Sequence, residues 1–170
     1  MQPSSSLPAN SIAFIGLCNE YCTAVTAAAE SEPDAFIAEM LRLLPRIYIS
    51  ASDIPEAELL AGEGYVDDAM DEASYTDLRD RMAALLGAND TYLETFEEDM
   101  KYSDTPIAAS ISENLADIMQ VTYNFISTVR HAPVEAIPAI LAAVKDDFNT
   151  YWSQLICNVL RPLNHIRYNN

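Results

Sequence analysis

The chain has 170 residues, half of them apolar, and its 26 acidic side chains outnumber its 9 basic ones to give a formal net charge of −17. A chain of this length and apolar content can bury the core of one ordinary domain without disulfides or metal ions. Its acidity argues against binding to nucleic acid or to an anionic membrane surface, because phosphate groups repel it. The simpler interpretation of the charge is that it keeps the protein soluble and monomeric, although it would also suit a basic partner or divalent cations.

The N-terminal residues 1–10 are expected to form a disordered lead. They lack the basic residues and the apolar stretch of a secretory signal, and no apolar run in the chain is long enough to span a membrane. Three cysteines, an odd number, fit a reducing compartment, so we expect a cytoplasmic location.

Apolar residues at helical spacing predict about five main helices, packed as one all-α bundle domain over residues 11–168. The first helix is expected at 11–29 with Ser11 as its cap. The second is expected at 33–51, where Pro33 suits the first turn. The scarcity of glycine, with only 4 residues, supports the helical interpretation.

The link between the second and third helices is rich in acidic residues. Residues 52–73 contain five acids and two glycines in the stretch "GEGYVDDAMDEAS", which predicts a mobile acidic loop. The third helix is expected at 74–86, with Gly87 as its stop. Residues 89–106 fit a helix and a strand equally well, because both spacings are present in a short segment.

Two helices complete the predicted bundle. The fourth is expected at 110–129, since Ser110 and Glu113 have the spacing of a capping box. The fifth follows "RHAP", and Pro162, late in its apolar run, is expected to bend or end it. Trp152 lies in its apolar stripe and is expected to anchor the core, whereas Cys157 falls on the opposite side.

Both of these helices also carry a polar stripe at helical spacing. The stripes comprise Glu113, Asp117, Gln120 and Asn124 on the fourth helix and Gln154, Asn158, Arg161 and His165 on the fifth. An antiparallel pairing of the stripes would form a charge-assisted seam or a small acid/base site. A simple hairpin, however, places Asp117 opposite about residue 147, roughly 20 Å short of Arg161 at 1.5 Å per residue. Without partners the stripes are expected to be solvent-exposed helix faces. The residues on them that could contact a partner or each other are Glu113, Asp117, Asn158, Arg161 and His165.

No established catalytic or metal-binding motif is present. The chain lacks a glycine-rich phosphate loop, Cys-x-x-Cys, His-Glu-x-x-His and Gly-x-Ser-x-Gly, and neither histidine has a glutamate three residues before it. We therefore predict no catalytic residue, metal ligand or cofactor. The leading hypothesis is a non-enzymatic acidic module that binds another protein, a basic one in particular, and an inhibitor or immunity role against a basic nuclease is one form of it.

The alternative hypothesis is a metal-assisted hydrolase. It would use carboxylates near residues 97–117, with Arg161 or His165 binding an anion. The sequence indicates no oligomeric state for either function.

Five segments carry a resemblance to a known family. They are "EYC" at Glu20, "LLPRIY" at Leu43, "RMAALLGANDTYLETF" at Arg81, "SISENLADIMQ" at Ser110 and "YWSQLICNVLRPLNHI" at Tyr151. In this order and spacing they make residues 12–166 resemble a bacterial family of uncharacterised all-helical proteins, domain-of-unknown-function family 5063. The resemblance implies a helical fold and transfers neither an activity nor a catalytic residue.

Overall fold

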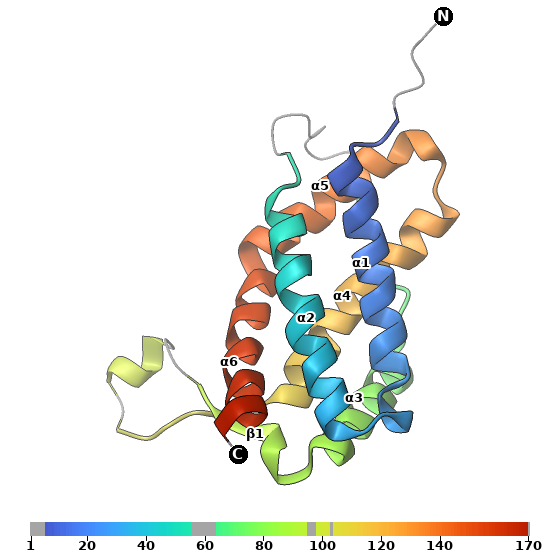
Figure 1. Ribbon diagram of the computed structural model, residues 1–170. Helices are drawn as coiled ribbons and strands as arrows, with labels where there is room; N and C mark the ends of the chain where they lie inside the picture. Colours follow the sequence, from blue (N-terminus) through green and yellow to red (C-terminus); the bar gives the residue numbers. More distant parts are fainter. Residues whose placement is uncertain (1–5, 56–63, 95–97, 103, 170) are drawn as a thin grey trace, which may run out of the picture.

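The computed structural model describes residues 6–55, 64–94, 98–102 and 104–169, and it is almost entirely helical (Figure 1). Its α-helices are α1 (Ala9–Thr26), α2 (Pro33–Ser52), α3 (Glu72–Leu86), α4 (Ile111–His131), α5 (Ile137–Asp147) and α6 (Ser153–Asn169). Short 3-10 turns are η1 (Ala28–Glu30), η2 (Gly87–Asp90), η3 (Glu98–Lys101) and η4 (Val134–Ala136), and η5 (Phe148–Trp152) is a π-helical turn. Strands β1 (Thr91–Leu93) and β2 (Ala108–Ser110) form a small antiparallel sheet. The predicted all-α bundle is confirmed.

Four helices enclose the core. α1 packs against α2 and α4, and α6 packs against the same two helices, while α3 lies along α4 outside this ring (Figure 1). An aromatic cluster fills the centre, with Phe14 against Phe125 at 5.3 Å between ring centroids and Phe148 against Trp152 at 4.8 Å. Trp152 is fully buried, which confirms its prediction as a core anchor. No helix in the described part of the chain has the length and apolar character needed to cross a membrane.

The first helix begins earlier than its sequence signal suggested. α1 starts at Ala9, inside the predicted lead 1–10, of which residues 1–5 lie outside the described residues. Asn10 donates to the Ser50 carbonyl at 3.0 Å and accepts from the Ser50 hydroxyl at 3.0 Å, which ties this end to α2. Ser11 is buried inside the helix, so its predicted role as cap is wrong.

The described part of the acidic loop is anchored. Of residues 52–73, the stretch 56–63 lies outside the described residues. In the remainder, the Asp67 amide donates to Thr128 Oγ1 at 2.9 Å, and the Ala69 and Met70 amides donate to Asn124 Oδ1. These bonds hold the segment against α4, so the expectation of a mobile loop is wrong for residues 64–71. Asp71 then caps α3 by accepting from the Ser74 amide.

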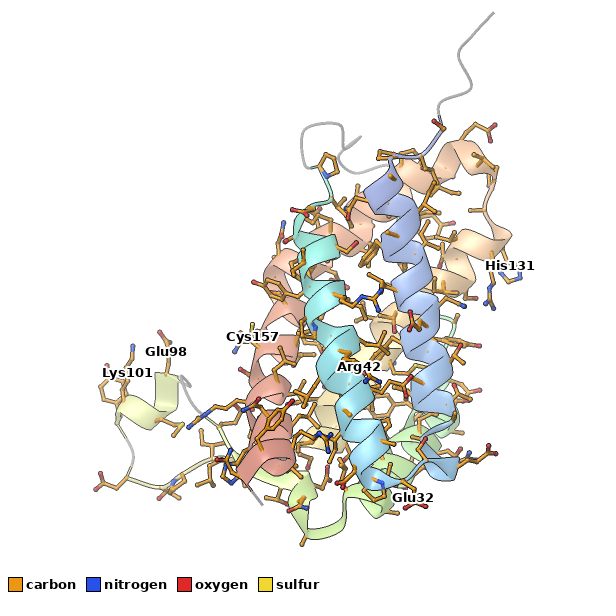
Figure 2. All side chains as sticks on the ribbon, viewed as in Figure 1. Glu32, Arg42, Glu98, Lys101, His131 and Cys157 are labelled. Carbon is orange, nitrogen blue, oxygen red and sulfur yellow. The ribbon has the colours of Figure 1, made fainter. Side chains whose placement is uncertain are left out.

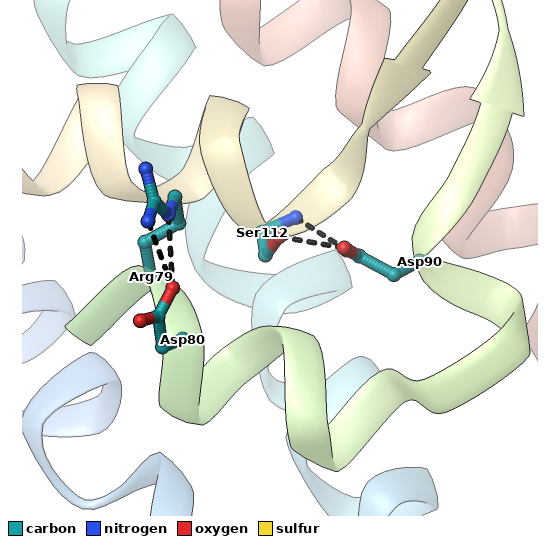
Figure 3. Close-up of polar contacts among 4 residues, drawn as sticks. All are labelled: Arg79, Asp80, Asp90 and Ser112. Carbon is teal, nitrogen blue, oxygen red and sulfur yellow. Dashed lines mark hydrogen bonds and ion pairs between the residues drawn. The ribbon is translucent and has the colours of Figure 1, made fainter. Parts of the chain in front are cut away.

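The cap of α4 comes from a distant residue. Ser110 occupies the N-cap position, but its side chain makes no capping bond, so the predicted capping box is not formed. Asp90 instead accepts from the Ser112 amide and from the Ser112 hydroxyl, both at 2.7 Å (Figure 3). Asp90 follows α3, so this contact fixes the end of one helix to the start of another.

The segment whose structure the sequence left open, residues 89–106, contains both kinds of element: strand β1 over Thr91–Leu93 and the 3-10 turn η3 over Glu98–Lys101. Its residues 95–97 and 103 lie outside the described residues. Strand β2, the partner of β1, was not predicted, because three residues are too few to show an alternating pattern. Glu94 continues the pairing through a bond from its amide to the Ile107 carbonyl at 2.8 Å.

The predicted fifth helix is one helical run with a π-turn inside it. α5, η5 and α6 follow one another without a break from Ile137 to Asn169, and Pro162 lies inside α6. Of the two effects predicted for Pro162, a bend or an end of the helix, the end does not occur. Lys145, almost fully buried, donates to the carbonyls of Ala51 and Ser52 at 2.9 Å each. The lysine thereby satisfies the last carbonyls of α2 and fixes that end of α2 to α5.

Candidate functional site

The candidate residues of the two polar stripes lie in two separate places. On α4, Glu113 is exposed and Asp117 is half-buried beside α3 and the π-turn. On α6, Arg161 and His165 line a cavity with β1, and neither Glu113 nor Asp117 lines it. The sequence argument against a direct pairing of the stripes agrees with this arrangement. Asn158 is half-buried on α6, one turn before Arg161.

Asp117 sits among acidic and phenolic side chains. The Tyr75 hydroxyl, from α3, donates to Asp117 Oδ1 at 2.6 Å. Burial raises the pKa of Asp117, the Tyr75 bond lowers it, and the charge of Glu113 raises it. The pKa of Tyr75 is raised as well, first by burial and then by its bond to Asp117.

The π-turn brings a second acidic group to the same face. Burial is the main cause of the raised pKa of Tyr151, followed by the charges of Asp117 and Asp147. The pKa of Asp147 is itself raised by burial and by neighbouring Asp146. π-turns often occur at functional sites. The π-turn η5 beside Asp117 and Asp147 therefore makes this surface a candidate functional site.

A small cavity of about 330 Å³ lies in this face. It is lined by Val66, Asp68, Gln120, Val121, Asn124, Val144, Asp147 and Tyr151. We call the surface that carries Asp68, Glu113, Asp117 and Asp147 the acidic face. It joins the anchored loop, α4 and the end of α5.

The acidic face has no ion-pair partner within the described residues. The described residues form two ion pairs, Arg79–Asp80 at 2.9 Å and Arg81–Asp77 at 2.8 Å. Both pairs lie on α3, and neither includes an acid of the acidic face. Nor does the described part of the chain hold three or more His, Cys, Asp or Glu side chains placed to bind a metal ion. The chemistry that the face offers is attraction for a cation supplied from outside the molecule.

The second place is a groove beside α6, which we call the α6 groove. Its volume is about 740 Å³. The lining comprises Ala88, Asn89, Thr91, Tyr92, Leu93, Glu94, Met100, Pro106, Arg161, Pro162, Asn164, His165, Ile166 and Asn169. This size is within the usual range for sites that bind small molecules or peptides.

Cys157 does not form a cysteine–histidine nucleophile with either histidine. Figure 2 shows Cys157 on α6 and His131 at the end of α4 on opposite sides of the molecule. Cys157 and His165 are eight residues apart on one helix, a rise of about 12 Å at 1.5 Å per residue. Burial raises the pKa of the remaining thiols, Cys18 and Cys22, which are not reactive positions.

Sequence reasoning missed several residues of the acidic face. Asp147 could have been found, since the hairpin arithmetic placed Asp117 opposite about residue 147. Nothing in the sequence indicated Tyr75, because α3 reaches Asp117 through tertiary packing alone. Asp68 lay in the predicted loop, for which no position could be assigned.

Comparison with solved structures finds the same architecture elsewhere. The crystal structure of protein BF1032 from Bacteroides fragilis superposes with a TM-score of 0.80 at 27% sequence identity, over 95% of this chain and 94% of that one. The comparison with curated proteins gave no match. The model of the family named Domain of unknown function (DUF5063) matches residues 5–169, nearly the whole chain. The chain therefore belongs to the DUF5063 family.

Proposed function

We propose that this protein is a non-enzymatic interaction module whose acidic face binds a basic segment of a partner protein. The observation that carries the proposal is the state of Asp117 and Asp147. Asp117 is half-buried and Asp147 is exposed, both have raised pKa values, and neither has a basic partner within the described residues. A lysine or arginine from a partner would stabilise the ionised carboxylates and lower their raised pKa values.

The overall charge supports this choice. A net charge of −17 attracts a basic protein over a distance and raises its association rate. Tyr75 and Tyr151 add large, partly apolar surfaces next to the carboxylates, which suits protein interfaces. An inhibitor or immunity role against a basic nuclease remains one form of this proposal.

The hydrolase alternative needs acids and an anion-binding group in one cavity. Glu113 and Asp117 are not among the residues that line the α6 groove with Arg161 and His165. Thermal unfolding with Mg²⁺, Ca²⁺, Mn²⁺ or Zn²⁺ separates the two functions. We expect each ion to act only as matched monovalent salt does; a rise of several degrees with one ion at micromolar concentration would favour the hydrolase.

The direct test compares two double variants that remove the same charge. Asp117→Asn with Asp147→Asn alters the acidic face, and Glu20→Gln with Asp53→Asn alters exposed positions on α1 and directly after α2. The probe is a fluorescein-labelled peptide of alternating lysine and alanine, measured by anisotropy at physiological salt. We expect the first variant to weaken binding at least fivefold and the second less than twofold. Equal losses, or no binding by the wild type, would refute the assignment of the acidic face.

The same pair of variants identifies the natural partner. Wild-type protein is used as bait in extract, and proteins are retained as partners only if Asp117→Asn with Asp147→Asn loses them and Glu20→Gln with Asp53→Asn keeps them. The expected partner carries a basic surface. A partner that both variants retain equally would contradict the proposal.

A further inference from the structure

Among the described residues, β1 has a strand partner on one edge and none on the other. β2 occupies the paired edge, with Tyr92 opposite Ala109, and the Glu94 amide donates to the Ile107 carbonyl. In an antiparallel pair only alternate residues direct their backbone groups to the partner strand. Tyr92 and Glu94 therefore face β2, whereas Thr91 and Leu93 direct their N–H and C=O groups away from it. Both of these residues are exposed.

The open edge of β1 borders the α6 groove. β1 lies beside the C-terminal end of α6 in Figure 1, and all three of its residues line the groove together with the last turns of α6. Pro162 and Ile166 supply apolar surface on the helix side. A strand added at the usual spacing of about 4.8 Å from β1 would lie in this groove.

The groove lacks the acidic excess of the rest of the molecule, because the charged groups on its α6 side are all basic. From residue 153 to the end of the chain there is no acidic residue, and Arg161, His165 and Arg167 are present. Arg161 and His165 are exposed and line the groove, and Arg161 forms no ion pair with a described residue. Glu94 is the acidic lining residue, and it accepts a hydrogen bond from the Tyr92 hydroxyl at 3.1 Å.

We propose that the α6 groove binds an extended acidic peptide segment of a partner protein, which adds as a third strand to the open edge of β1. The backbone groups of Thr91 and Leu93 pair with the peptide, and Arg161 and His165 attract its carboxylates. Strand addition of this kind gains affinity from the main chain and specificity from alternate side chains. The inference goes beyond the acidic face, since it uses another surface and the opposite charge.

Two pairs of variants test the mode of binding. Leu93→Pro removes an outward N–H without disturbing the pairing with β2, because proline is tolerated at the open edge of a strand, and Leu93→Ala keeps the N–H. Arg161→Gln removes a groove charge, whereas Arg167→Gln removes the same charge from α6 at a position that does not line the groove. Unfolding midpoints confirm that each variant is folded.

The probe is obtained by displaying random heptapeptides, selecting on the wild-type protein and counter-selecting on the Leu93→Pro/Arg161→Gln double variant. We expect enriched peptides to contain Asp or Glu at alternate positions. Their affinity should fall at least tenfold with Leu93→Pro and fivefold with Arg161→Gln, but less than twofold with Leu93→Ala or Arg167→Gln. If no peptide is enriched over the counter-selection, the proposal is refuted.

A modified peptide gives a test that needs no protein variant. N-methylation of the residues whose N–H groups face β1 should abolish binding, and N-methylation of the intervening residues should change it less than threefold. Equal effects of the two patterns would show that no strand is added. Binding of acetate or inorganic phosphate at Arg161 and His165, seen by NMR without any peptide bound, would instead identify a small-anion site and overturn the proposal.

Discussion

Replacing Asp90 tests how strongly one carboxylate stabilises the start of α4. Asp90→Ala removes two hydrogen bonds of 2.7 Å and leaves the amide and hydroxyl of Ser112, which is 2% exposed, without their partner. A lost N-cap costs about 0.5–2 kcal/mol and a hydrogen bond to a charged group about 1.5–3 kcal/mol. Because these two values describe overlapping effects, we expect a loss of about 2–3 kcal/mol, or roughly 4–12 °C in unfolding midpoint.

The matched control is visible in the same region of the molecule (Figure 3). Asp80 pairs with Arg79 at 2.9 Å, but both side chains are exposed, and such pairs contribute about 0–1 kcal/mol. Urea unfolding at pH 7, followed by circular dichroism, compares Asp90→Ala with Asp80→Ala. Similar losses for the two variants would refute the reasoning, because the buried position of Ser112 would then make no difference. Amide exchange at Ser112 should also increase only in Asp90→Ala.

Three further predictions concern other contacts. Burial raises the pKa of Asp117, so the ionised carboxylate destabilises the folded protein above that pKa. Asp117→Asn should therefore raise the urea midpoint at pH 7. The difference between the midpoints of the variant and the wild type should shrink as the pH falls through the raised pKa toward the unfolded value near 3.8. Lys145→Met leaves two helix-end carbonyls without a donor and should lower the free energy of unfolding by about 1–3 kcal/mol, measured in urea. Gly64→Ala would place a Cβ against the Ala139 carbonyl group and should detach the anchored loop, which would be seen as faster amide exchange there. Gly16→Ala, with open space around it, should not change amide exchange in that loop.

Local signals in the sequence predicted the helices well where a single segment contained all the necessary information. The structure confirms the predictions that Pro33 lies in the first turn of α2 and that Gly87 ends α3. Gly87 adopts a φ of 56°, a conformation that glycine reaches without strain, so its signal needed no tertiary context. The apolar stripe of the last helix likewise placed Trp152 in the core.

Local signals failed where two segments compete for the same role. Ser110 and Glu113 have the spacing of a capping box, yet Asp90 caps α4 from the adjacent turn. A carboxylate accepts two hydrogen bonds from Ser112 and carries a full charge near the helix N-terminus, which a serine hydroxyl cannot match. The sequence contains Asp90 but gives no indication that it lies there.

For the candidate sites too, the sequence identified individual residues, and the tertiary structure supplied their neighbours. Arg161 and His165 were identified as a basic stripe from the sequence, and the structure adds the open edge of β1 beside them. Asp117 was identified as one member of a polar stripe. Its contacts with Tyr75 and its nearness to Asp147 depend on how α3 and the π-turn pack on α4.

The sequence by itself determined the all-α class, the positions of most helices, the buried tryptophan and the separation of a strongly acidic chain from a basic C-terminal helix. These properties follow from composition and from the 3.6-residue period, which are local quantities. The tertiary structure alone decided the cap of α4, the pairing of two three-residue strands, the anchoring of the acidic loop and the grouping of acids around the π-turn. Each of these depends on contacts between residues far apart in the chain, and such contacts form only when the helices pack together.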